Sequence, residues 1–317
     1  MLSLLLSILL TTPTQQPGTL GTPPQKPLKT TELREDANQR LTQLLKGSKL
    51  GSNQVFKRFS QKKGIWSQQW PRRLDLTGIN WLNKQAGVAI TPRHLVHAAH
   101  YPYFPHTKEI LFHDREGNPH KRKIARRITL QNEHFKTDIA IVLLAEPLPP
   151  SIKTYRLLPP RTDYPHTLEN APVITTNQFR ELHIHAINRI GNRGVSFRKN
   201  PLFPTHYKNL IKGDSGHPSF LLVGGEPVLI QTHSGGGAGS GPFYSDPDVF
   251  AALVKACANL DPNYQIQTVP LDPQLAPAPA KASPKQPQKH QPSPAPTSPE
   301  PTTPRVRGVP TPTSDVY

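Results

Sequence analysis

The chain has little cysteine, few aromatic residues and no long apolar segment. Cys257 is the only cysteine among 317 residues, which excludes an internal disulfide and a cysteine-based metal site. The 14 histidines form no H-E-x-x-H motif, and we expect no metal and no other cofactor. The leading apolar segment, residues 2–10, is too short to cross a bilayer, and no transmembrane span is expected.

Acidic residues are also scarce, with 21 Asp and Glu against 38 Lys and Arg, so the net charge is +17. The excess is spread over residues 57–63, 72–73, 120–127 and 188–199. A basic surface of this kind attracts polyanions or anionic envelope surfaces, although scattered charge can also serve solubility alone. No recognised helix-turn-helix, zinc-finger or RNA-binding motif accompanies the charge, which argues against nucleic acid as the partner. The sequence carries no signal for an oligomeric state.

Both ends of the chain differ in composition from its middle. Residues 1–15 are a candidate signal peptide because of their apolar core, and they predict a secreted or periplasmic protein. No basic residue precedes that core and no Ala-x-Ala cleavage site follows it, so the alternative is an apolar segment packed on the domain. Residues 16–62 are predicted to be a linker and a helical N-terminal extension, either a pro-segment or an integral part. Residues 263–317, rich in proline, are predicted to form a disordered tail.

The remaining residues, 63–262, are predicted to form a two-part domain that divides near residue 160. The extension contains a predicted helix over residues 31–47, and an amphipathic helix with Ser/Asp caps is predicted over residues 245–260. Between them lie short β-favouring runs in two groups. The runs are 86–91, 109–114, 123–130 and 138–145 in the first group, and 171–176, 181–187, 194–199, 219–223 and 227–233 in the second. Two groups of antiparallel strands closed by a helix favour two β-barrels over a parallel α/β sheet.

Three separated stretches carry residues suited to nucleophilic chemistry. Ser215 lies in "KGDSGHP", and a serine hydroxyl needs an adjacent base to attack at neutral pH. His100 ends the stretch "VHAAH" after a strand-like segment and can supply that base. Asp138 opens a fully apolar run, where a carboxylate needs a hydrogen-bond partner. An imidazole N–H would satisfy the carboxylate and fix the histidine tautomer.

Each of these residues has an alternative. His97 lies three residues before His100 and could be taken for the base. Asp114 competes with Asp138, but it lies in "HDREGN", which is typical of a hairpin turn. Ser215 alone could be an ordinary turn serine.

The stretches "AAHY", "TDIAIVLL" and "KGDSGHP", in the order His–Asp–Ser, resemble the three motifs of the trypsin/chymotrypsin-like serine peptidases. The resemblance covers about residues 80–260 and includes "GPFYSDPDVFAALV", similar to the family's Pro-x-Tyr element and C-terminal helix. It implies an all-β fold of two antiparallel six-stranded barrels of the chymotrypsin type with a C-terminal helix. It also implies a serine endopeptidase that acts on protein or peptide substrates. Ser215 would form the acyl-enzyme, His100 would act as general base and then acid, and Asp138 would orient His100.

The resemblance assigns further residues. The backbone N–H groups of Gly213 and Ser215 would form the oxyanion hole. Gly213 has no Cβ to obstruct this turn, and Gly216 keeps the turn tight beside the nucleophile. Asp214 is expected to be structural, a partly buried acid that needs a cation or N–H groups as partners. No Ile-Val-Gly-Gly segment offers Asp214 a new N-terminus, and Tyr101 stands where animal members have a cysteine, so packing must replace disulfides.

Substrate contacts can be placed only through the resemblance. Asn209 would lie at the base of the primary pocket, and its neutral side chain argues against a preference for Lys or Arg. Gly235 and Gly236 would open the pocket mouth and pair with the substrate backbone. Ser234 is the preferred match to the serine that contacts the catalytic aspartate, and Thr232, on the same side of the strand, is the alternative.

Two functional hypotheses compete with the peptidase. A catalytically silent protease-like domain could serve as a basic binding module with a docking tail, although such a scaffold has no chemical need for all three residue types. A nucleic-acid binder would lose affinity steeply as salt rises. For the peptidase, neutral to mildly alkaline pH is expected to suit His100, because a base must be unprotonated.

Overall fold

The computed structural model describes residues 27–49, 51–81, 86–100, 108–131 and 136–272. The chain divides into two units, residues 1–274 and 275–317, and the description that follows concerns the first. The candidate signal peptide, most of the predicted linker, Tyr101 and the proline-rich tail beyond residue 272 lie outside the described residues.

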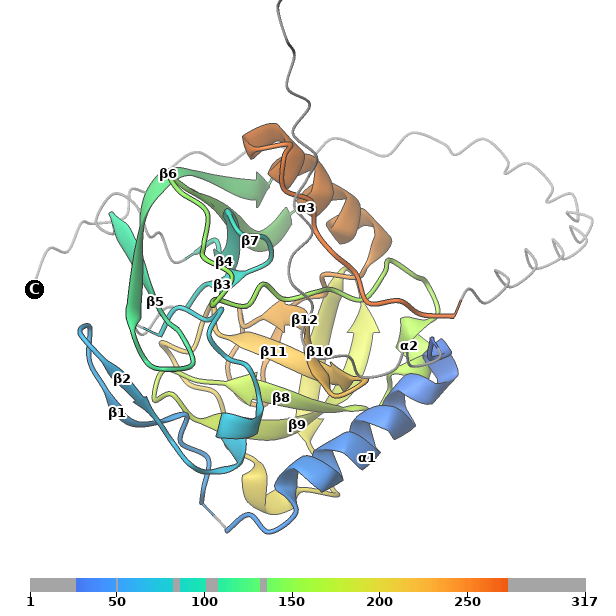
Figure 1. Cartoon of the computed structure of the whole chain (residues 1–317). Helices are drawn as coiled ribbons and strands as arrows, with labels where there is room; N and C mark the ends of the chain where they lie inside the picture. Colours follow the sequence, from blue (N-terminus) through green and yellow to red (C-terminus); the bar gives the residue numbers. More distant parts are fainter. Residues whose placement is uncertain (1–26, 50, 82–85, 101–107, 132–135, 273–317) are drawn as a thin grey trace, which may run out of the picture. The chain divides into compact units, whose positions relative to one another are not determined.

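The fold is mostly β and contains two curled antiparallel half-barrel sheets, compatible with a double-β-barrel fold (Figure 1). The first sheet has five described strands in the order β3-β4-β7-β6-β5. Its strands are β3 (Val88–Ala89), β4 (His94–Ala98), β5 (Glu109–His113), β6 (Pro119–Gln131) and β7 (Lys136–Leu144). Residues 139–144 of β7 are all apolar and buried, because this strand lies inside the sheet between β4 and β6.

The second sheet has six strands in the order β12-β11-β8-β9-β10-β13. They are β8 (Pro172–Thr176), β9 (Leu182–Gly191), β10 (Gly194–Lys199), β11 (Pro218–Val223), β12 (Glu226–Thr232) and β13 (Ser240–Pro242). The two sheets approach each other where β4 contacts β12 and β7 contacts β13.

Short elements surround the sheets. A hairpin of β1 (Phe56–Phe59) and β2 (Gly64–Trp66) forms a separate two-stranded sheet. Three 3-10 turns, η1 (Thr30–Glu32), η2 (Trp70–Arg73) and η3 (Pro204–His206), and the short helix α2 (Tyr164–Thr167) lie in the connections. The long helices are α1 (Leu33–Leu45) and α3 (Pro247–Leu260).

Helix α1 is part of the domain core. Its buried face contains Leu33, Ala37 and Leu41, with exposed fractions of 0%, 1% and 1%. The helix packs against β8 and β11 of the second sheet (Figure 1). The backbone N–H of Gly224, after β11, donates to Asp36 Oδ2 at 3.0 Å. The predicted helix of the N-terminal extension is therefore confirmed, and it lies on the domain.

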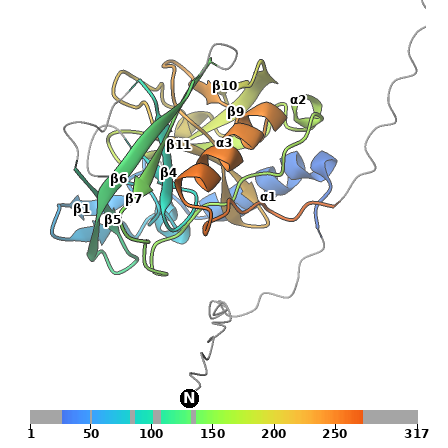
Figure 2. The same cartoon turned by 90° about the horizontal axis from the view of Figure 1, so that it is seen from above.

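Helix α3 begins as its sequence predicts. Asp246 Oδ1 accepts the N–H groups of Asp248 and Val249 at 3.0 and 3.2 Å, and Pro247 occupies the first turn. The helix packs against β6 and β7 and lies beside them in both views (Figures 1 and 2). Among the described residues, no helix has the length and apolar character needed to cross a membrane.

The structure differs from the sequence-based expectation in three places. The first sheet has five described strands, and the short strands β1, β2, β4 and β13 were not predicted as separate elements. The predicted strand 123–130 is longer and begins at Pro119. Residues 263–272, predicted to begin the disordered tail, instead lie on the domain: the N–H of Val269 donates to the carbonyl of Leu157 at 2.9 Å, and Val269 is buried. Local composition does not predict this pairing, because the backbone hydrogen bonds are made to residues far away in the sequence.

Candidate active site

His100 and Asp138 lie side by side at the ends of two paired strands. Ala98 of β4 pairs with Ile139 of β7. His100 follows Ala98 and Asp138 precedes Ile139, so this pairing brings the two residues together. Asp138 Oδ1 accepts the backbone N–H of His100 at 2.8 Å, and Asp138 Oδ2 lies 2.6 Å from His100 Nδ1. A carboxylate only accepts, so Nδ1 carries a proton in this contact. This arrangement fixes both the orientation and the tautomer of His100.

The alternatives to these two residues have other partners. His97 is buried on β4, and its Nε2 accepts from Arg127 Nε at 3.3 Å. Burial, aided by the Arg127 charge, lowers the pKa of His97 to about 3. Asp114 accepts the backbone N–H of Asn118 at 2.7 Å within the turn between β5 and β6. The structure therefore joins His100 to Asp138 and places the two alternatives in structural positions.

The loop that carries Ser215 lies against the strand that leads to His100. Gly216 has φ = +81°, and a Cβ at this position would lie 2.4 Å from the carbonyl oxygen of Ala86 and 3.5 Å from the amide nitrogen of Ala98. Ala98 is two residues before His100, so the Ser215 loop lies close to the backbone segment that leads to His100. Ser215 is half-buried, and none of the residues that the structure describes hydrogen-bonds its hydroxyl. Catalytic hydrogen bonds are often long before substrate binds.

This loop offers two backbone donors. The N–H groups of Gly213 and Ser215 have no hydrogen-bond partner in the described part of the chain, and Gly213 is buried with φ = +104°. Buried N–H groups without partners are rare in folded proteins. Two N–H groups in one turn that no described residue accepts are suited to bind an anion.

Asp214 has the N–H partners that its burial requires. Its Oδ1 accepts from the backbone of Gln178 at 3.0 Å, and its Oδ2 accepts from the backbone of Ile211 at 2.7 Å. Asp214 as a whole residue has an exposed fraction of 2%. Asp214 thus ties its own loop to the turn that contains Gln178.

Ser234 lines a surface pocket together with Asp138. The pocket has a volume of about 410 Å³ and is lined by Asp138, Ser234 and residues of β9, β10 and β13. The Ser234 hydroxyl is buried and has no hydrogen-bond partner among the described residues. Thr232 points its hydroxyl to the Tyr244 hydroxyl at 2.7 Å. Ser234 is therefore the nearer match to a serine beside the aspartate, although it makes no hydrogen bond to Asp138.

Leu210 and Gly237, the residues that follow the pocket candidates Asn209 and Gly236, are joined by backbone hydrogen bonds. The N–H of Leu210 donates to Gly237 at 2.7 Å, and the N–H of Gly237 donates back at 3.0 Å. Leu210 is buried, and its side chain lies against Gly239. A Cβ at Gly239 would lie 2.7 Å from Leu210 Cδ1. Asn209 is exposed and accepts the Tyr207 hydroxyl. Its amide thus lies at the surface, and no enclosed pocket base formed by described residues surrounds it.

The neighbouring substrate-binding candidates, Gly235 and Gly236, lie next to this bridge. Gly235 pairs with Ser240 of β13, and a Cβ at Gly235 would lie 2.4 Å from the Ser240 hydroxyl. Gly236 is exposed. A side chain at Gly235 would therefore require the Ser240 hydroxyl to move.

Comparison with known proteins adds no family assignment. No family model matches the chain, and no curated protein matches it. Within the described ranges, no group of three or more His, Cys, Asp or Glu residues is placed to hold a metal ion.

Two residues near the site were not anticipated from the sequence. Arg127 Nη2 donates to the carbonyl of Ala99, next to His100, at 2.8 Å. Gln178 Nε2 donates to the carbonyl of Lys212 at 2.9 Å. Neither lies in a motif, and both act through contacts with distant segments, so no local signal identifies them.

Proposed function

We propose that the protein is a serine endopeptidase with the two-barrel fold of the trypsin/chymotrypsin-like kind. Ser215 Oγ attacks a peptide carbonyl and passes its proton to His100 Nε2, and the new C–O bond gives a tetrahedral oxyanion. The C–N bond then breaks, and His100 returns the proton to the leaving amine. Water attacks the acyl-enzyme by the same route and regenerates Ser215.

The observation that carries this proposal is the double contact between Asp138 and His100. One carboxylate holds both the backbone N–H and the Nδ1 side of the ring of a histidine, the contact that an orienting acid makes with a general base. The closeness of the Gly216 backbone to Ala98, whose amide nitrogen would lie 3.5 Å from a Cβ at Gly216, supports the approach of Ser215 to that base. The N–H groups of Gly213 and Ser215 are suited to the oxyanion, and such donors contribute about 10²–10³ in rate.

The proposed substrate is an extended peptide that pairs with the segment Ser234–Gly236. The neutral side chain of Asn209 disfavours a preference for Lys or Arg, and the backbone bridge between Leu210 and Gly237 disfavours a deep pocket. We therefore expect cleavage after small or uncharged side chains. Mass spectrometry of a digested peptide library, with Ser215→Ala as the control, measures this preference.

A fluorophosphonate probe tests the function itself. We expect the purified protein to be labelled on Ser215, labelling to vanish in Ser215→Ala, and labelling to persist in Ser196→Ala. Ser196 is a matched control because it lines the pocket beside Asp138 on the second sheet. Absence of labelling in folded wild-type protein would reject the peptidase and favour the catalytically silent binding module.

A further inference from the structure

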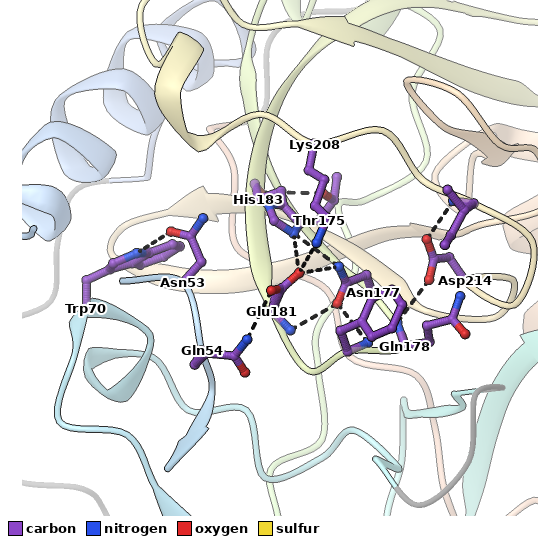
Figure 3. A network of polar contacts seen from close by, with 12 residues as sticks. Asn53, Gln54, Trp70, Thr175, Asn177, Gln178, Glu181, His183, Lys208 and Asp214 are labelled. Atoms are coloured by element: carbon purple, nitrogen blue, oxygen red, sulfur yellow. Dashed lines mark hydrogen bonds and ion pairs between the residues drawn. The ribbon is translucent and has the colours of Figure 1, made fainter. Parts of the chain in front are cut away.

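The turn between β8 and β9 contacts three successive residues of the Ser215 loop. Gln178 donates its backbone N–H to Asp214 and its side-chain Nε2 to the carbonyl of Lys212, at 3.0 and 2.9 Å. Between these two points, a Cβ at Gly213 would lie 2.7 Å from the Gln178 amide. Figure 3 shows Gln178 and Asp214 facing each other across this contact.

The side-chain contact fixes the direction of a peptide plane. In a trans peptide, the carbonyl of one residue and the N–H of the next point in opposite directions. When Gln178 holds the carbonyl of Lys212, the N–H of Gly213 must therefore point away from Gln178. On that side it has no partner among the described residues, as an oxyanion donor requires before substrate binds.

Gly213 makes this plane easy to rotate. A glycine visits positive and negative φ with similar ease, and Gly213 has φ = +104°. Rotation of the peptide would bring the Lys212 carbonyl where the N–H now points, and a carbonyl repels an oxyanion. The loop therefore needs an external contact that favours one orientation.

The turn that carries Gln178 is itself held by a polar network (Figure 3). Asn177 Oδ1 accepts the backbone N–H groups of Phe179 and Glu181, both at 3.0 Å. Glu181 Oε2 accepts from Asn177 Nδ2 at 2.9 Å and from Lys208 Nζ at 2.7 Å. Asn177 is buried. These contacts hold the backbone on both sides of Gln178, so its side chain can act as a fixed donor.

From this geometry we infer that Gln178 is a positioning residue that orients the Gly213 N–H for oxyanion binding. The inference rests on the proposed peptidase function and assigns no contact between Gln178 and substrate. Gln178 acts only through the carbonyl of Lys212.

The test removes the donor and keeps the shape. In Gln178→Met the side chain has a similar length and no N–H donor, and the backbone N–H of residue 178 still donates to Asp214. Acylation by p-nitrophenyl acetate should show kcat about 5- to 100-fold lower, between the effect of one net hydrogen bond and that of a lost oxyanion donor. KM should change less than about twofold, and the labelling rate with a fluorophosphonate should fall in parallel. Gln178→Glu, of the same shape, should show the same loss if the methionine variant does not fold.

Controls separate positioning from general stability. Gln39→Met places the same substitution on the exposed surface of α1 and should leave kcat unchanged. The pH profile of Gln178→Met should keep its shape, because His100 is untouched. Wild-type labelling with an unchanged kcat in both Gln178 variants would overturn the inference and leave the peptidase intact, as would a shifted pH profile. Wild-type protein that is not labelled at all would instead reject the proposed function.

Discussion

Replacement of Leu41 by alanine tests whether the N-terminal helix belongs to the domain or is a removable pro-segment. Leu41 is 1% exposed and shares a core cluster with Trp66, Trp70 and Trp81. Truncation of a buried leucine costs about 2–5 kcal/mol through lost burial and the remaining cavity. Because Leu41 is enclosed on all sides, we expect a loss of about 3 kcal/mol in the free energy of unfolding.

Urea unfolding followed by tryptophan fluorescence measures this loss. The chain has 3 tryptophans, all buried in the domain core and outside α1, so the signal reports the domain and not the helix alone. With a denaturant slope near 3 kcal/mol/M, the upper value for small proteins, the midpoint should fall by about 1 M. Gln43→Ala, exposed on the same helix, should leave the midpoint almost unchanged. An equal midpoint for Leu41→Ala and wild type would refute the view that α1 is part of the folding unit.

Two further predictions concern pH and backbone geometry. Burial and the Arg127 charge lower the pKa of His97 to about 3, whereas the pKa of an unfolded histidine is near 6.5. Between these two pH values the unfolded chain binds more protons than the folded chain. The contribution of His97 to the free energy of unfolding should therefore be fully present above pH 6.5 and be lost as the pH falls toward 3. His97→Gln should reduce the pH slope of the unfolding free energy below pH 6 by about 1.4 kcal/mol per pH unit, and a slope equal to that of wild type would contradict this account. Gly216→Ala should abolish fluorophosphonate labelling and destabilise the domain by more than the roughly 1–2 kcal/mol of a left-handed residue, because its Cβ would meet the carbonyl of Ala86 at 2.4 Å. Gly47→Ala, with φ = +76° and open space around the Cβ, should show only the smaller loss, and retained labelling in Gly216→Ala would show that the turn can move.

Local patterns predicted the elements of the fold well. Both long helices and the main strands agree with their predicted ranges within a few residues. Apolar periodicity, helix caps and β-branched runs are features of short stretches of sequence, so they can be read without the tertiary structure. Besides β1, β2 and β4, two short segments were not predicted: β13, which has three residues, and residues 263–272, which were assigned to the tail. Their structure comes from pairing with distant strands, which a local pattern does not contain.

The sequence by itself determined which side chains are present for the proposed chemistry. The residue types and order of His100, Asp138 and Ser215, with glycines at 213 and 216, follow from the printed chain alone, because motif identity is a property of short segments. Only the tertiary structure decided how these segments meet. The carboxylate of Asp138 contacts His100, 38 residues away in the sequence, and Gln178 donates to the carbonyl of Lys212, 34 residues away. Contacts at such separations depend on sheet register and on which loops pack together, and those are set by the whole core.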